Sequence, residues 1–315
     1  MDPLTHLTLG ACAGELMLGK KFGKKAMLFG SLAANLPDVD TVAGLFVPGD
    51  QALLLHRGIT HSLFFALLAG LLLAYLFSKW YPWVGYTAFA LFFCLEMGLH
   101  DLLDTCTSYG TGLLEPFSHE RFSFHLLFVV DPLFTISLLI ATLVLLIRKT
   151  GDISRMKWAA GGIAISLLYV GAALFCKSRL DPAADMTTPA PFNCLLWYCI
   201  KRSNNGYYTG YQSVFDKEPV RYEFHPQNRQ LLIHPERYLV RFANGYYTVS
   251  GSGGQLYFNV LRFGQVQGWQ TKEAPFVLSY PAGTTYGENM IIQKGRLSGW
   301  SSQSIHQYLE RIMGR

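Results

Sequence analysis

Imidazole and carboxylate side chains recur at short spacings in the first hundred or so residues of this chain. His56 and His61 lie in the string HRGITHS, and His100 and Asp104 lie in the string HDLLDTCTSYGT. Imidazole nitrogens and carboxylate oxygens together are the ligands that zinc and related divalent metals take in proteins. The sequence therefore predicts a metal site that draws ligands from both strings.

The second string has a spacing that suits one face of a helix. His100 and Asp104 are four residues apart, so a single metal can reach both. Glu96 lies one turn earlier, as a further ligand or as an acceptor for an imidazole N–H. Asp101 is turned about 100° away on an ideal helix, which ranks it lower.

The first string needs a break in the helix. His56 and His61 would point about 140° apart on a continuous helix. They converge only if Gly58 breaks the helix; otherwise they serve different metals. Arg57 and Arg121 are the cations best placed to hold a phosphate or carboxylate substrate. The predicted catalytic side chains are Arg57, Glu96 and Arg121.

Apolar segments surround these strings and must position them. Half of the residues are hydrophobic, only 15% are charged and the mean hydropathy is +0.22, which is too apolar for an ordinary soluble domain. The apolar runs are 4–19, 26–36, 62–78, 84–99, 126–147 and 158–176. Spanning a bilayer takes about 20 apolar residues, so the first two runs are short. The composition predicts an α-helical membrane bundle of about six segments over residues 1–178.

Basic residues set the expected orientation, because they favour the cytoplasmic side. They cluster at 20–25, at Lys79 and at 148–157. Placing these clusters inside makes six segments alternate and puts everything after residue 177 outside. The predicted metal ligands then all fall on the outer side: His6, Asp38, Asp40, His56, His61, His100 and Asp104.

The net charge of +5 sits partly in these clusters, and no basic and aromatic stripe is interleaved as in single-strand binders. No nucleic acid partner is therefore expected. The location expected from the segments is an integral membrane protein in contact with lipid.

From residue 179 the chain changes to short β-prone runs separated by Asn-Gly and Gly-rich turns. The expected strands are 195–200, 207–215, 220–224, 238–249, 256–262 and 276–280, and a helix is expected at 301–313. This predicts a small β-rich extracytoplasmic domain over residues 179–315. Cys194 and Cys199 are placed to pair if that domain is outside.

Several strings resemble those of a known family. They are DPLTH at 2–6, PDVD at 37–40, HRGITHS at 56–62, and the HxxxD of 100–104 followed by TSYGT. They are similar to the YdjM-type family of membrane-bound metal-dependent hydrolases over roughly residues 1–180, in the subgroup with an extra C-terminal domain. That family is distantly similar to the zinc-dependent phospholipase C and single-strand nuclease superfamily. The resemblance, rather than the spacing, implies hydrolase activity.

What the resemblance implies is an enzyme of the bacterial inner membrane with zinc as the expected metal. Its expected substrate is a small-molecule or lipid phosphoester, with a lipid head group among the candidates. The superfamily's helix-borne His-x-x-x-Asp pair maps onto His100 and Asp104. The superfamily also uses a processed N-terminal amine as a ligand, whereas Met1 is followed by no visible cleavage site, so His6 is the candidate substitute. One or two metals are expected.

Two other readings stay open. In the first, the chain is a non-catalytic envelope protein in which a structural metal staples the helices and the β-rich domain binds a partner. In the second, the chain is a transporter, which needs Glu15, Glu96 and Asp131 to line a continuous path. A catalytic zinc keeps an open position for water, whereas a structural zinc is closed by four protein ligands.

Overall fold

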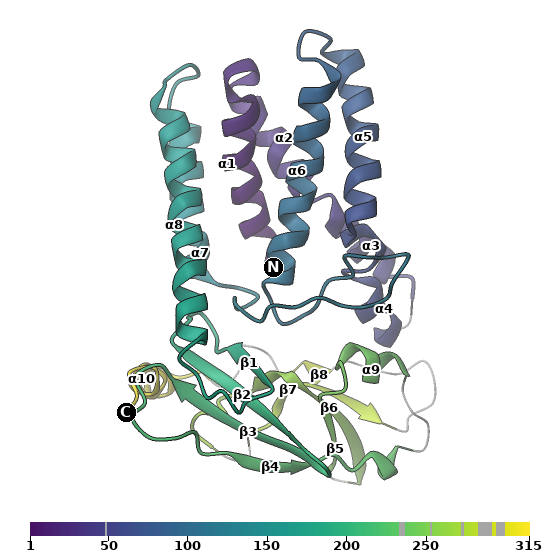
Figure 1. Cartoon of the computed structure of the whole chain (residues 1–315), viewed down its shortest axis with the longest axis vertical. Helices are drawn as coiled ribbons and strands as arrows, with labels where there is room; N and C mark the ends of the chain where they lie inside the picture. The colour runs from purple at the N-terminus through teal and green to yellow at the C-terminus, as the bar shows by residue number, and fades with distance from the viewer. Residues whose placement is uncertain (48, 233–236, 253, 272–273, 283–291, 294–299) are drawn as a thin grey trace. The chain divides into compact units, whose positions relative to one another are not determined.

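The computed structural model of the chain (Figure 1) describes residues 1–315 except 48, 233–236, 253, 272–273, 283–291 and 294–299. It divides into two compact units, one of Met1–Ala43 with Leu55–Ala172 and the other of Gly44–Leu54 with Ala173–Arg315. The first unit is helical and the second carries two antiparallel sheets. This confirms the predicted helical region followed by a β-rich domain.

Six helices of 11 to 24 residues match the six predicted apolar segments. They are α1 (Pro3–Phe22), α2 (Lys24–Ala34), α5 (Leu63–Trp80), α6 (Tyr86–Thr105), α7 (Pro132–Ile147) and α8 (Ser154–Lys177). In the described part of the chain, α5, α6 and α8 are long and apolar enough to cross a membrane, and α7 is a shorter apolar helix.

Side-chain caps fix where three of these helices begin. Asp2, Ser62 and Asp131 are the N-caps of α1, α5 and α7, and each side chain accepts a hydrogen bond from a backbone N–H of the first turn. Such caps satisfy donors that a helix leaves without intrahelical partners. They also position the site, because His6 lies just inside α1 and His61 directly precedes the cap of α5.

Glycines allow α1 and α2 to form a tight hairpin. A Cβ built on Gly30 would overlap the carbonyl oxygen of Gly10 and would lie 2.9 Å from Oε1 of Glu96 on α6. Small residues at a crossing let helices come into backbone contact. The end of α2 is thereby held against α6, which matters for the orientation of a site histidine.

A buried ion pair joins α1 to α8. Nε and Nη2 of Arg155 lie 2.8 and 2.6 Å from the two carboxylate oxygens of Glu15. Arg155 also donates to the carbonyl oxygen of Leu145 on α7. Glu15 therefore has a structural partner, and Asp131 is a cap, so two of the three acids that a transporter path requires are engaged in packing contacts.

Four short elements are described between α2 and α5. They are η1 (Pro37–Val39), α3 (Asp40–Gly44), α4 (Gly49–Leu55) and η2 (Ile59–His61). The chain reverses between α4 and η2 at Arg57, whose φ of 62° is in the left-handed region. The helix break on which the convergence of His56 and His61 depends is thus present, with the turn centred on Arg57 and Gly58.

The second unit has two four-stranded antiparallel sheets. The first is β1 (Met186–Pro189), β2 (Leu196–Ser203), β3 (Gly206–Ser213) and β4 (Glu223–Pro226), and the second is β5 (Tyr247–Ser252), β6 (Gln255–Gln265), β7 (Phe276–Ala282) and β8 (Ile292–Gln293). Buried Tyr198 and Ile200 of β2 pack in one cluster with Leu261 of β6 and Phe276 of β7. The expected C-terminal helix is α10 (Ser302–Ile312).

The strands of this unit differ from the expected strands in two places. Residues 238–249 are not one strand: α9 (Arg237–Phe242) comes first, and β5 begins only at Tyr247. Leu239, Phe242 and Ala243 are all buried, which is the spacing of a helix face, and Asn244-Gly245 with positive φ ends it. Strand β1 lies before 195–200, the first expected strand. None of the six cysteines forms a disulfide, so the conditional pairing of Cys194 with Cys199 is not seen.

Replacing Gly30 with alanine should destabilise the helical unit by about 1–3 kcal/mol, because the added methyl group has no room at the hairpin crossing. Gly98→Ala on α6 is the matched control: its Cβ would meet nothing within 4 Å, so helix propensity should make it neutral or stabilising by up to about 1 kcal/mol. Thermal unfolding in detergent measures both. Equal unfolding temperatures for the two variants would contradict the packing argument.

Candidate metal centre

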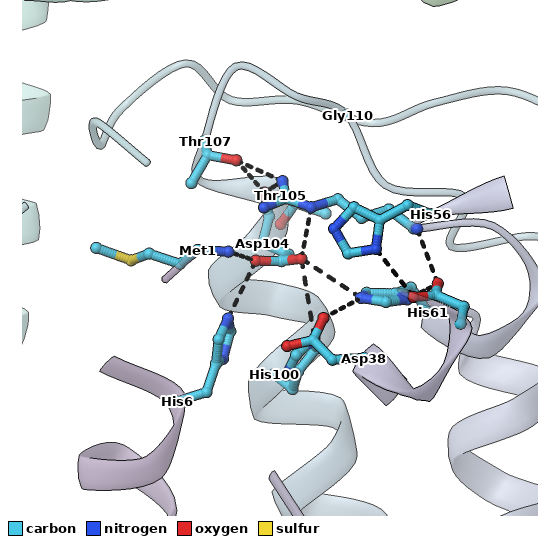
Figure 2. Close-up of polar contacts among 12 residues, drawn as sticks. Met1, His6, Asp38, His56, His61, His100, Asp104, Thr105, Thr107 and Gly110 are labelled. Carbon is cyan, nitrogen blue, oxygen red and sulfur yellow. Dashed lines mark hydrogen bonds and ion pairs between the residues drawn. The ribbon is translucent and has the colours of Figure 1, made fainter. Parts of the chain in front are cut away.

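All seven predicted metal ligands come together at one end of the helical unit; Figure 2 labels each of them except Asp40, which contacts His56 and His61. They come from α1 (His6), η1 (Asp38), α3 (Asp40), the turn after α4 (His56), η2 (His61) and α6 (His100 and Asp104). Helix α6 contributes its pair from the last two turns, on one face as the spacing predicts. The other ligands arrive on short segments, because no single helix can surround a point in space.

Asp38, His61 and His100 have donor atoms that lie within 4.8 Å of one another, and a carboxylate oxygen of Asp104 lies beside them. Nε2 of His61 lies 3.3 Å from Oδ1 of Asp38 and 3.6 Å from Oδ2 of Asp104. Nε2 of His100 lies 3.7 and 3.8 Å from the same two oxygens. Ligand atoms around tetrahedral zinc are about 3.3–3.4 Å apart when zinc–ligand distances are about 2.0–2.1 Å. The observed separations therefore fit one small divalent cation.

The tautomer of His100 is fixed in the form that a metal requires. Its Nδ1 lies 2.6 Å from the carbonyl oxygen of Ala34, the last residue of α2, so Nδ1 must carry the proton and donate it. Its Nε2 is buried and makes no hydrogen bond in the described part of the chain. A backbone acceptor behind a ligating imidazole is the usual arrangement around protein-bound metals. A cation bound between Nε2 and the two carboxylates would give this buried lone pair a partner.

Asp40 has a different task from Asp38. Its two oxygens accept from Nδ1 of His56 at 2.9 Å, Nδ1 of His61 at 3.1 Å, the Thr60 hydroxyl at 2.7 Å and the backbone N–H of Arg57 at 3.0 Å. Asp40 is thus placed as an outer carboxylate that orients two imidazoles. Asp40, His56 and His61 also have donor atoms within 4.8 Å of one another, so they form a further group able to hold a cation.

His6 and the amino group of Met1 meet the other oxygen of Asp104. Nε2 of His6 lies 3.2 Å from Oδ1, and the Met1 amino group contacts the same atom. The ring of His6 stacks on His100 with centroids 3.8 Å apart. His6, His100 and Asp104 therefore form a second group able to hold a cation, adjoining the first through the shared Asp104 and His100.

Arg57 faces inward rather than toward an opening. Its Nε lies 2.8 Å from Oδ2 of Asp104, its Nη1 donates to the Thr107 hydroxyl at 2.7 Å, and its guanidinium lies over the ring of Tyr109. The side chain is 3% exposed. The guanidinium of Arg57 is therefore paired with the carboxylate of Asp104. It is less available to bind a substrate anion than the sequence predicts.

The other two predicted catalytic residues lie outside the ligand cluster. Nη1 of Arg121 donates to the carbonyl oxygens of His56 and Gly110, which ties two loops of the site together. Glu96 is fully buried one turn before His100, and its carboxylate has no hydrogen-bond partner among the described residues. Asp101, ranked lower from its angle, is likewise buried and unpartnered.

Sequence reasoning missed three supporting contacts. The Ala34 carbonyl has no side-chain signal and could not be found. Thr60 and Thr107 lie inside the two strings that carried the prediction, and their hydroxyls bond Asp40 and Arg57. A hydroxyl within a ligand string is a signal for this kind of support.

Hydrogen bonding controls protonation on the loop side of the site. Burial opposes ionisation of Asp38 and Asp40, but hydrogen bonds from His61 to both, and from His56 to Asp40, outweigh it and hold the pKa of each carboxyl below its usual value. Burial also opposes charge on His61, but the hydrogen bonds to Asp38 and Asp40 outweigh it and raise the pKa of His61 to about 9.

The metal-free protein should therefore lose stability as the pH rises from about 6.5 to about 9. His61 has a higher pKa folded than unfolded, so its stabilising contribution is complete below the unfolded value and is lost through the folded one. Thermal unfolding in chelator measures the effect, with His61→Gln, which does not titrate, as the control. The same fall in both proteins would show that His61 is not its source.

Comparison with known proteins agrees with this architecture. A family model described as "YdjM inner membrane protein" matches residues 1–180. The inner membrane protein YbcI of Escherichia coli (strain K12) is 37% identical over 122 residues, which are 38% of this chain and 69% of that protein. The uncharacterized protein YfhP of Bacillus subtilis (strain 168) is 29% identical over 182 residues, 54% of this chain and 51% of that protein. No solved structure matches the chain. The apolar helices and these matches make it a membrane protein, and the chain belongs to the YdjM inner membrane protein family.

Proposed function

We propose that the protein is a membrane-bound, metal-dependent hydrolase that acts on a phosphoester. The observation that carries the proposal is the orphaned Nε2 of His100, which is buried and faces carboxylate oxygens of Asp38 and Asp104 at 3.7 and 3.8 Å. Buried polar groups without partners are rare, and each calls for an explanation such as an ion.

Asp38, His61, His100 and Asp104 would hold the metal, and a mixed nitrogen and oxygen set of this kind suits zinc. When bound, the metal supplies Lewis acidity that makes water a competent nucleophile near neutral pH and offsets charge on phosphoryl oxygens. Water adds to phosphorus, one P–O ester bond breaks, and a proton is passed to the leaving oxygen. The choice of reaction rests on the resemblance of the HRGITHS and HxxxD strings to those of a hydrolase family, which implies this activity.

We assign to His56 the transfer of the proton to the leaving oxygen. Its Nδ1 is bonded to Asp40 and its Nε2 makes no hydrogen bond in the described part of the chain. The side chain is 28% exposed, whereas His61 and His100 are fully buried. An imidazole oriented by a carboxylate and open on its other side is suited to general acid–base catalysis.

A structural role for the metal is the second candidate, and one observation favours it. Asp38, His61 and His100 form one group of donors and Asp104 lies 3.6 Å from His61, so four protein ligands, the number in a closed structural zinc site, are close together. Against it, the Asp38 side chain is 21% exposed, so one side of the ligand set reaches the surface. If the metal is structural, the chain would be an envelope protein whose β-rich unit binds a partner.

The distribution of basic residues gives the orientation that we propose. The basic residues at 20–25, Lys79 and 148–157 lie at turns that follow α1, α5 and α7, opposite to the ends that carry the ligands. Positive residues favour the cytoplasm. The site and the β-rich unit would then lie on the outer side of the inner membrane.

Metal content and hydrolysis test the proposal together. The purified protein should hold about one to three equivalents of zinc, the range of hydrolytic sites, and His100→Ala should lose both the metal and phosphodiester hydrolysis. His119→Ala is the matched control, because His119 is 67% exposed, its Nδ1 lies 2.8 Å from Oε2 of Glu115, and it is not among the predicted metal ligands. Metal analysis by mass spectrometry and head-group release from phosphodiesters are the readouts.

Two outcomes would count against specific parts of the proposal. Full metal retention in the double variant His61→Ala/His100→Ala would reject the site. Metal bound by four protein ligands, with no water in the coordination sphere by X-ray absorption and no hydrolysis, would support the structural alternative instead.

A further inference from the structure

The segments that carry the ligands turn polar side chains inward and apolar ones outward. Val39 lies between Asp38 and Asp40, and its side chain is 51% exposed; Ile59 precedes His61 by two residues and is 54% exposed. Other large exposed apolar residues lie on neighbouring segments. We call the group the apolar rim: Val39, Val42, Ile59, Leu63 and Phe117. A site served from water would have the reverse pattern, with polar groups around its opening.

The apolar rim continues into the surface of a helix that is apolar and long enough to cross a membrane. Leu63 begins α5, and Leu67, Leu68 and Leu72 on the same helix are all exposed. The ring of Phe117 packs edge-on against Phe64 at 5.4 Å between centroids, so the 111–118 loop extends this surface. Contiguous exposed apolar side chains mark an interaction surface, and on a helix that crosses a membrane they face lipid.

The opening of the site borders the apolar rim. Among the four converging ligands, Asp38 is the one with appreciable exposure, since His61, His100 and Asp104 are at most 1% exposed. Asp38 is the chain neighbour of Val39, and η1, which carries both, packs against η2, which carries Ile59. A molecule that reaches the metal ligands from this side must pass over apolar side chains.

We infer that the apolar rim is immersed in lipid and that the substrate is a membrane lipid with a phosphoester head group. Its acyl chains would lie against Val39 and Ile59 while the head group reaches Asp38 and His56. The choice of substrate rests on the proposed hydrolase function. A charged phosphoester linked to long apolar chains matches both halves of this surface, whereas a free phosphoester would leave the apolar half exposed to water.

Photocrosslinking in vesicles of phosphatidylethanolamine and phosphatidylglycerol tests the immersion without relying on activity. Benzoylphenylalanine in place of Ile59 should crosslink to phospholipid. The same group in place of Phe215, an equally exposed apolar position in the β-rich unit at 55%, should not. Crosslinks from position 59 only to the chain itself or to a second copy would overturn the inference, because protein rather than lipid would then cover the apolar rim.

Chain-length selectivity tests the substrate. The readout is kcat/KM for phospholipids with long acyl chains, relative to water-soluble six-carbon analogues with the same head groups. In the variant Val39→Ser/Ile59→Ser this ratio should fall at least about tenfold, because two half-exposed aliphatic side chains no longer contact the substrate. Phe215→Ser should leave it unchanged, and zinc content confirms an intact site in both.

The two proposals fail in different ways. An unchanged ratio in the double variant, or a preference of the parent protein for the water-soluble analogues, overturns the lipid substrate while leaving the hydrolase in place. Hydrolysis of neither class by the parent protein, with the lipid crosslink intact, overturns the proposed function and with it the substrate, and the lipid-facing rim stands.

Discussion

The carboxylate of Asp104 is the group on which the arrangement of the helical unit depends. It lies at the end of an apolar helix and is 1% exposed, and moving an unpaired charge to such a place costs several kcal/mol. The chain offsets this with cationic and hydrogen-bonding partners from distant segments. Arg57 and the Met1 amino group contact the carboxylate, and the imidazoles of His6, His61 and His100 surround it. The segments of the site thus come together because each supplies a partner to the buried carboxylate of Asp104.

Because the partners must surround Asp104, they come from one continuous helix and from several short elements. Helix α6 supplies two ligands from one face, and its hydrogen bonds need no outside partners. The remaining ligands come from η1, α3, the turn at Arg57 and η2, where the backbone changes direction every few residues. Irregular backbone close to lipid is tolerated where its polar groups are satisfied within the protein. Asp40, which accepts the backbone N–H of Arg57, is one such internal partner.

What the sequence could predict follows from how local each signal is. Six apolar runs and the His100–Asp104 spacing are local patterns, and each appears in the structure as expected. Predicting that the seven side chains meet needed the additional rule that basic residues mark one end of the bundle, and the structure does bring the seven together. The pairing of Glu15 with Arg155 could not be foreseen, because 140 residues separate them. The helix at 237–242 was missed because a short apolar run can form either a helix or a strand, and only its packing partners decide between them.

The division of labour between the two carboxylates of PDVD follows from the geometry of a tight turn. In a 3₁₀ helix two residues subtend about 240°, so Asp38 and Asp40 point to different sides of their segment. Between them they engage both nitrogens of one imidazole: Asp38 lies 3.3 Å from Nε2 of His61, and Asp40 lies 3.1 Å from Nδ1. With both nitrogens engaged by carboxylates, the ring of His61 is held in one orientation, and a metal in place of the proton on Nε2 would find a fixed tautomer. The HRGITHS string completes the arrangement, because the Arg57 N–H and the Thr60 hydroxyl hold Asp40 in place. A shift of either carboxylate by one residue would lose this match, so the two strings must be understood as one structural unit.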